Sequence, residues 1–220
     1  MSETVSNSLP SYPEAIKTMN DAMRLASSRE SFEIKKATLY VAGNAEKDVY
    51  VVAMRGTDRS FDKNDVLGIP VCLKSFIAKT NIYFEKAKDA IFNEIPVTSD
   101  IVFIGHSLGG MIAQQLAADV DINIRFNVKN LLTIGSPFVK VKGRICPFYR
   151  FADKADFIPW LGTSIVANLV TNKPVFKSNG YFGKPVKAHT DSYRDSDSWR
   201  EYDCYGVHNG THALVFIEES

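Results

Sequence analysis

The sequence predicts an α/β fold with a mostly parallel central sheet and helices on both of its faces. Two observations lead to this prediction. Apolar, β-branched runs of strand length alternate along the chain with segments whose apolar residues recur at helical spacing. One such run, residues 101–104, ends in a glycine-flanked turn that leads directly into a helical segment. With 220 residues, the chain is expected to form a single domain over residues 1–220.

Each predicted element follows from its residue pattern. Residues 12–28 have apolar side chains at helical spacing, and Pro13 suits a first turn, so a helix is expected to open the domain. Residues 37–42 and 49–54 are rich in β-forming residues, and the polar segment 43–48 joins them, which predicts an antiparallel hairpin. The further elements expected in order are a mostly helical span over 70–92, a strand at 101–104, a helix at 111–118, and strands at 130–135 and 147–151.

The turn after residues 101–104 is the most informative part of the chain. Residues 105–109 read G-H-S-L-G and match the G-x-S-x-G pattern of a nucleophile elbow, in which a serine projects from a sharp turn between a strand and a helix. The positions two before and two after the serine tolerate almost no side chain, which accounts for Gly105 and Gly109. Ser107 is therefore the candidate nucleophile.

A serine nucleophile needs a histidine to take its proton and an acid to orient that histidine. In proteins with this elbow, the acid and then the histidine follow the serine along the chain. Asp156 is the first choice for the acid, because it follows the strand at 147–151 and precedes an apolar residue and the rigid Pro159. Asp153, at the end of the same strand, is the alternative.

The choice of histidine is more open. His106 lies on the wrong side of the elbow. His189 follows a loop containing glycine and proline, which suits a residue projected from the end of a strand, and it is the first choice for the base. His212, just before the apolar run 213–217, and His208, in a turn-like segment, remain as alternatives.

Catalysis of this kind also needs hydrogen-bond donors for the negative charge that develops on the substrate oxygen. The backbone N–H of Leu108, immediately after the serine, is one expected donor. Thr57, just after the second hairpin strand, offers a backbone N–H and a hydroxyl group for the other. An ordinary polar turn at residues 55–58 is the competing interpretation.

Four blocks of residues, 52–57, 105–110, 133–137 and 156–159, together resemble the fungal-type, or class 3, lipase family of α/β-hydrolases. The resemblance spans about residues 37–159 and implies the α/β-hydrolase fold, Ser107 as nucleophile, Asp156 as acid, and Thr57 with Leu108 as the oxyanion hole. It implies a structural role for residues 135–137 and places a lid at residues 60–70. Members of the family usually carry an aromatic residue soon after the histidine, a pattern that both His189 and His212 satisfy here.

Composition limits the kinds of binding partner and the cellular compartment that we expect for this protein. A formal net charge of +1 with interspersed acids and bases gives no electrostatic case for nucleic acid or for an anionic membrane surface. The three cysteines are far apart and lack the spacing of a zinc site, so neither a metal nor another cofactor is expected. Without a Sec-type signal peptide or an apolar run of transmembrane length, we expect a cytoplasmic protein or one exported by another route.

The sequence thus predicts a serine carboxylic-ester hydrolase, a lipase, esterase or phospholipase that uses a Ser-His-Asp triad. The many apolar residues between positions 159 and 183 favour an ester with an apolar acyl chain and transient contact with a lipid interface. The alternative is a catalytically inactive protein of the same fold that binds lipid or a protein partner. An acyltransferase that uses the same acyl-enzyme is a lesser possibility.

Overall fold

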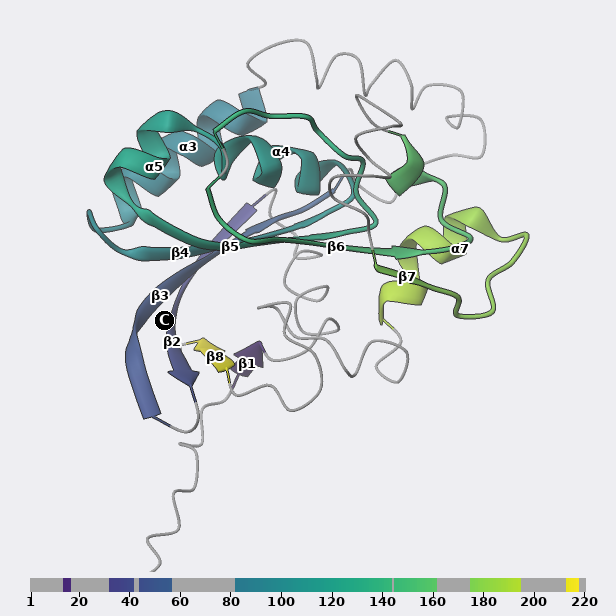
Figure 1. Ribbon diagram of the computed structural model, residues 1–220, viewed down its shortest axis with the longest axis horizontal. Coiled ribbons are helices and arrows are strands. Elements are labelled where there is room, and N and C mark those ends of the chain that lie inside the picture. The colour runs from purple at the N-terminus through teal and green to yellow at the C-terminus, as the bar shows by residue number, and fades with distance from the viewer. Residues whose placement is uncertain are drawn as a thin grey trace, which may run out of the picture.

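The computed structural model describes residues 14–16, 32–41, 44–56, 82–143, 145–161, 175–194 and 213–217 (Figure 1). The strands among them are β1 (Glu14–Ile16), β2 (Phe32–Val41), β3 (Asn44–Met54), β4 (Asp100–His106), β5 (Asn127–Ile134), β6 (Phe148–Asp153), β7 (Val175–Lys177) and β8 (Ala213–Ile217). The helices are α3 (Ile82–Glu94), α4 (Leu108–Leu116), α5 (Val120–Arg125) and α7 (Pro185–Thr190), with the short 3₁₀ helices η2 (Ile158–Trp160) and η3 (Ser192–Arg194).

All of these strands belong to one eight-stranded sheet in the order β1-β8-β2-β3-β4-β5-β6-β7. The five strands from β3 to β7 run parallel to one another. The antiparallel hairpin of β2 and β3 extends the sheet, and β8 and β1 complete that side in antiparallel pairings. The sheet is therefore mostly parallel around its centre, as in the α/β-hydrolase fold that the sequence predicts.

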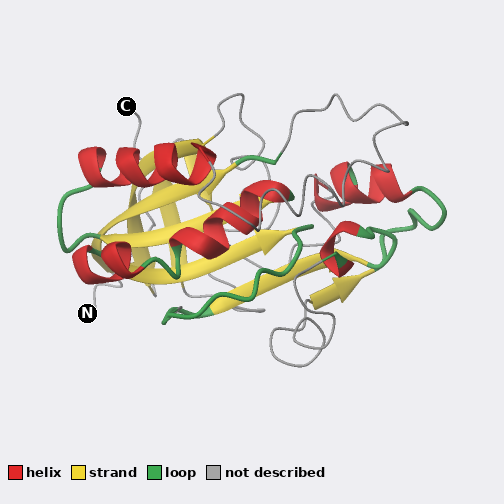
Figure 2. Cartoon of the chain, turned by 90° about the horizontal axis from the view of Figure 1, so that it is seen from above, coloured by secondary structure: helices red, strands yellow, loops and turns green. Residues whose placement is uncertain are grey.

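Helices α3, α4 and α5 lie over one face of the sheet (Figures 1 and 2). The main core fills the space between them, where Ala87 and Ile91 of α3 and Ile112 of α4 meet Phe103 of β4 and Leu131 of β5. Each large apolar side chain removed from water in this way contributes about 1.5–3 kcal/mol of burial free energy. The core fixes the position of α4, and with it the turn that precedes α4.

Strand β4 is buried over almost its whole length, and only its last residue, His106, is partly exposed. A nearly continuous apolar strand of this kind is expected in the middle of a parallel sheet, where both faces are covered. Parallel strands end at the same edge of a sheet, so the residues that follow β3, β4, β5 and β6 come together there. The predicted site residues Ser107 and Asp156 both lie at this edge, directly after β4 and shortly after β6.

The strands and helices expected from about residue 82 to residue 153 are confirmed, with shifts of a few residues at their ends. The helix expected over 12–28 is wrong at its start, because Glu14–Ile16 is strand β1, paired with β8. A short apolar segment can satisfy either period, and pairing with a distant strand overrides a weak helical preference. Residues 17–28 and 70–81, also expected to be helical, lie outside the described residues.

The predicted hairpin is confirmed, but its turn is shorter than the sequence indicates. The polar residues 44–48 belong to β3, with Asn44 opposite Val41 and Asp48 opposite Thr38. Antiparallel strands tolerate polar residues where one face meets water, so polarity alone does not mark a turn. Helix α5 and strand β7 lie within the described residues but were not expected. No helix among the described residues is both long and apolar enough to span a bilayer.

Candidate active site

Ser107 occupies the turn between β4 and α4 in an unusual backbone conformation. Its φ and ψ are 55° and −127°, and it is one of two non-glycine residues with positive φ in the described part of the chain. The Ser107 N–H donates to the carbonyl oxygen of Ile134 at 3.0 Å, and the Ser107 carbonyl accepts from the N–H of Gly110 at 3.1 Å. A conformation of this kind costs about 1–3 kcal/mol and persists because the surrounding structure holds it.

The two glycines of the elbow are required by close packing, as the sequence predicts. A Cβ on Gly105 would lie 2.5 Å from the Cα of Gly110. A Cβ on Gly109 would lie 2.3 Å from the carbonyl oxygens of both Met54 and Arg55. Gly105 therefore allows α4 to start directly against the end of β4, and Gly109 allows the elbow to pack against the end of β3.

His189 joins Ser107 to Asp156. Its Nε2 lies 2.8 Å from Ser107 Oγ, and its Nδ1 lies 2.9 Å from Asp156 Oδ2. Because the carboxylate can only accept, Nδ1 of the neutral imidazole carries the hydrogen and Nε2 presents its lone pair to the serine hydroxyl. The imidazole is 15% exposed and the Asp156 carboxylate is fully buried. Three residues from three separate segments thus form one hydrogen-bonded chain.

The Asp156 carboxylate has two further partners. Tyr193 donates its hydroxyl hydrogen to Oδ2 at 2.6 Å, and the backbone N–H of Ile158 donates to Oδ1 at 2.9 Å. Burial and the adjacent carboxylate raise the pKa of Tyr193 well above its usual value, so Tyr193 remains a donor at physiological pH. These bonds satisfy a buried charge and fix the plane of the carboxylate that faces His189.

Asp153, the alternative acid, has a different set of contacts. It is fully buried and accepts hydrogen bonds from the hydroxyl of Ser192 at 2.6 Å and from the backbone N–H groups of Asn179 and Ala155. Its own N–H donates to the hydroxyl oxygen of Tyr193 at 3.0 Å. Asp153 therefore ties the loop after β6 to η3 and to the segment after β7, whereas Asp156 is the carboxylate that contacts His189.

His106, which the sequence argument set aside, supports His189. The two imidazole rings stack with their centroids 4.9 Å apart, and His106 Nε2 donates to the carbonyl oxygen of His189 at 3.0 Å. Burial and the proximity of His189 lower the pKa of His106 to about 3. His106 is therefore neutral near pH 7 and adds no positive charge beside His189.

The predicted oxyanion donors are described only in part. Leu108 is the first residue of α4, so its backbone N–H has no partner within the helix and lies beside the serine. Thr57 lies outside the described residues. The residue before it, Gly56, is close to the nucleophile, because a Cβ on Gly56 would lie 2.7 Å from the Cβ of Ser107. The Tyr83 hydroxyl donates to the carbonyl oxygen of Arg55 at 3.0 Å and anchors this segment to α3.

A buried apolar cluster, the apolar wall, adjoins Ser107, the candidate nucleophile. Leu108 and Met111 of α4 pack with Val139 and with Ile158 of η2, and the partly buried Val141, Phe157 and Leu161 extend the cluster. Gln114 holds this wall in place: its side chain donates to the carbonyl oxygens of Gly110 and Pro137 and accepts from the N–H of Val139. Trp160, the last residue of η2, is 42% exposed. The segment expected to form a lid, 60–70, lies outside the described residues.

The location of His189 differs from the sequence argument, although the structure brings it to the predicted partners. It lies on the short helix α7, not at the end of a strand. Pro185, at the start of α7, has the fixed φ that suits a first helical turn. His208 and His212, the alternative bases, lie outside the described residues. Sequence reasoning assigned no role to Tyr193 or His106, and the only signal for Tyr193 was the aromatic residue expected after the histidine.

Among the described residues, no group of three or more His, Cys, Asp and Glu side chains is arranged to hold a metal ion. The site is instead suited to nucleophilic attack on a carbonyl group. The hydroxyl of Ser107 contacts the imidazole of His189, which contacts the carboxylate of Asp156. The backbone N–H of Leu108 lies next to the hydroxyl as a candidate donor.

Comparison with known proteins gives one family match. The PGAP1-like alpha/beta domain matches residues 27–147, a span that includes the elbow and Thr57 but ends before Asp156 and His189. No curated protein and no solved structure matches the chain. The match supports the α/β-hydrolase superfamily that the sequence predicts, but not the class 3 lipases in particular. Because the match covers more than half of the residues, the chain belongs to the PGAP1-like alpha/beta domain family, which is of the α/β-hydrolase type.

Proposed function

We propose that the protein is a serine carboxylic-ester hydrolase of the lipase or esterase type. The observation that carries the proposal is the position of His189, within hydrogen-bond distance of both Ser107 Oγ and Asp156 Oδ2. A stabilising role alone does not explain why a strained serine, an imidazole and a buried carboxylate are aligned in this order. The family assignment supports a hydrolase-type fold, and the site supports the specific chemistry.

In the proposed reaction, Ser107 Oγ attacks the ester carbonyl carbon while His189 Nε2 takes the hydroxyl proton. The resulting oxyanion accepts a hydrogen bond from the N–H of Leu108, and Thr57 is the proposed second donor. Collapse breaks the bond to the leaving alcohol, which receives the proton from His189. Water then attacks the acyl-enzyme with His189 again as base, and the carboxylic acid is released as Ser107 regains its proton.

The apolar wall formed by Leu108, Met111, Val139 and Ile158 supports an apolar acyl chain. It includes Leu108, whose N–H would hold the oxyanion, and we propose that the acyl part of the ester lies on this side of the site. The resemblance to class 3 lipases points to the same substrate class. We therefore propose an ester of a fatty acid, with the nature of the alcohol left to product analysis.

Labelling with a fluorophosphonate probe, which reacts with activated serines, tests the proposal. The parent should be labelled, and Ser107→Ala should show no labelling. His189→Ala should lose about 10⁴-fold in the labelling rate or in hydrolysis of a p-nitrophenyl ester. His212→Ala should behave as the parent, which also separates the two histidines that the sequence left open.

The two aspartates supply a matched pair for the same assay. Asp156→Asn should lose most of the activity, because an amide cannot replace the carboxylate on His189 Nδ1. Asp153→Asn, an equally buried isosteric change three residues away, should retain the chemistry of any fraction that folds. Equal labelling of the parent, Ser107→Ala and His189→Ala would contradict the mechanism and favour a binding protein that does not turn over ester.

A further inference from the structure

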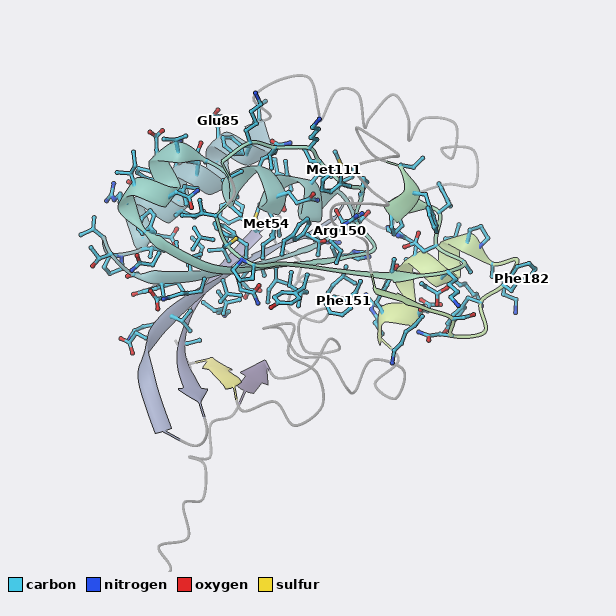
Figure 3. The ribbon with its side chains drawn as sticks, viewed as in Figure 1. Met54, Glu85, Met111, Arg150, Phe151 and Phe182 are labelled. Atoms are coloured by element: carbon cyan, nitrogen blue, oxygen red, sulfur yellow. The ribbon has the colours of Figure 1, made fainter. Side chains whose placement is uncertain are left out.

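A loop next to the candidate active site displays an aromatic residue to solvent. Phe182, between β7 and α7, is 94% exposed, more than the other large apolar side chains with high exposure in the described part of the chain. Figure 3 shows it at the tip of the loop, pointing away from the body of the protein. Four residues further on, Val186 in the first turn of α7 is 54% exposed. Exposure of a lone apolar side chain is common, so this one needs further support from its surroundings.

The backbone of the loop is built to hold Phe182 outward. The N–H of Lys184 donates to the carbonyl oxygen of Tyr181 at 2.8 Å, which closes a four-residue turn with Phe182 and Gly183 at its centre. Gly183 has a φ of 76°, the left-handed conformation that the third position of a type II turn requires. A Cβ on Gly183 would meet no atom within 4 Å, so nothing covers the tip among the described residues.

The base of the same loop is anchored to the site. The N–H of Asn179 donates to Asp153 Oδ2 at 3.1 Å, and the Asn179 side-chain amide donates to Ser192 Oγ at 2.8 Å. Helix α7 follows the turn and carries His189, seven residues after Phe182. A tip on an anchored base loses little conformational freedom when it binds, so most of its burial free energy is available for binding.

The net charge of the whole chain gives no case for an anionic membrane surface, but the charges around the tip have one dominant sign. Residues 177–194 contain four basic side chains and a single acidic one, Asp191. Lys184 and Lys187, on either side of Val186, are both exposed. An exposed aromatic residue flanked by lysines matches a membrane surface with anionic lipid headgroups, where the ring enters the headgroup layer and the ammonium groups stay at the charged surface.

We propose that the loop from Lys177 to Lys187, with Phe182 at its tip, docks onto an anionic phospholipid bilayer. This inference rests on the proposed function. If the protein hydrolyses lipid esters, docking beside α7 would bring the candidate active site to esters held in the membrane. The occupant is a lipid surface and not a protein, because the tip presents a single protruding ring with flanking cations.

Sedimentation with vesicles tests the docking without any turnover. All measurements use the full chain carrying Ser107→Ala, and the vesicles are either phosphatidylcholine alone or phosphatidylcholine mixed with phosphatidylglycerol. The protein should bind the mixed vesicles, and binding should weaken with added salt and on pure phosphatidylcholine. Adding Phe182→Ser should lower the partition coefficient at least about tenfold. Adding Lys184→Gln with Lys187→Gln should lower it by up to about thirtyfold.

Ile124→Ser is the matched control, because Ile124 is 80% exposed on α5 and lies outside the loop. It should leave vesicle binding unchanged. Equal losses for Phe182→Ser and Ile124→Ser, equal binding to both kinds of vesicle, or an effect of Phe182→Ser on self-association in place of vesicle binding would each overturn the proposal. Vesicle binding by the inactive variant and hydrolysis of a soluble ester by the parent are separate readouts, so failure of the docking and failure of the hydrolase function are distinguishable.

Discussion

Replacing Gly135 by alanine should damage the candidate active site without removing any of its side chains. Gly135 follows β5 in the left-handed region, with a φ of 54°. A Cβ at this position would lie 2.8 Å from the ring of Tyr193 and 2.9 Å from Asp156 Oδ2. Tyr193 is fully buried and cannot move away freely, so the added methyl group has to displace the carboxylate, the ring or the backbone.

The loss of unfolding free energy in Gly135→Ala has two parts, which can be separated by comparison with the same substitution at a second glycine. A non-glycine residue in the left-handed region costs about 1–2 kcal/mol from backbone strain alone. Overpacking a buried site adds about 1–3 kcal/mol. Gly180 has a φ of 77°, but a Cβ there would meet no atom within 4 Å. Gly180→Ala therefore carries only the first cost, while Gly135→Ala carries both, about 2–5 kcal/mol in total.

Urea unfolding and hydrolysis of a soluble p-nitrophenyl ester measure the two consequences. Gly135→Ala should lose more unfolding free energy than Gly180→Ala by the overpacking cost. It should also lose about 10²-fold in kcat/KM, the effect of displacing a catalytic group by about 1 Å. If the two variants lost the same stability and kept the same kcat/KM, Gly135 would have no role in shaping the site.

Three further predictions concern the groups around the triad and α4. Tyr193→Phe should cost about 2–3 kcal/mol in urea unfolding, because it removes the 2.6 Å bond to the Asp156 carboxylate and the acceptor of the Asp153 N–H; a loss below about 0.5 kcal/mol would contradict these bonds. The pKa of His106 falls from 6.5 in the unfolded chain to about 3 in the folded protein, so between these pH values the unfolded state binds the extra proton. The parent should lose up to about 1.4 kcal/mol of stability per pH unit as the pH falls through this range, and His106→Gln should lose less; parallel pH–stability curves would refute the assignment. Gln114→Ala should cost about 2–4 kcal/mol by leaving the Val139 N–H and the Pro137 carbonyl without this partner, whereas Gln115→Ala, at the partly exposed neighbouring position, should change little.

The parallel centre of the fold was predictable because its signals are redundant. Residues 101–104 are continuously apolar, as a strand covered on both faces must be, and the elbow glycines and the following helix point to the same architecture. The edge of the sheet lacks this redundancy. Strand β1 is three residues long, and its register depends on β8, about 200 residues further along the chain, which no local pattern reveals.

The candidate nucleophile and its partners were predictable to different degrees. The prediction of Ser107 depends on a local sequence pattern, and the structure places this residue in the strained turn that the pattern implies. His189 was one of three open choices, because the distance between a histidine and the elbow is set by loops whose lengths vary. The structure brings His189 to Ser107 from a helix, so the argument from strand ends reached the right contact by the wrong element. The catalytic role of each residue stays a prediction.

The choice between Asp153 and Asp156 shows where the missing information lies. Both carboxylates are fully buried and stand three residues apart, Asp153 at the end of β6 and Asp156 just after it, so local sequence cannot separate them. Their partners come from two adjacent residues of η3, about forty positions downstream: Ser192 donates to Asp153 and Tyr193 donates to Asp156. The side chain of serine is short and that of tyrosine is long, and with these two residues one short helix reaches both carboxylates. A buried carboxylate without a donor is costly, so each aspartate needs its own partner on η3. Because Ser192 donates to Asp153 and Tyr193 donates to Asp156, the order of these two residues helps to determine that Asp156 is the carboxylate that contacts His189.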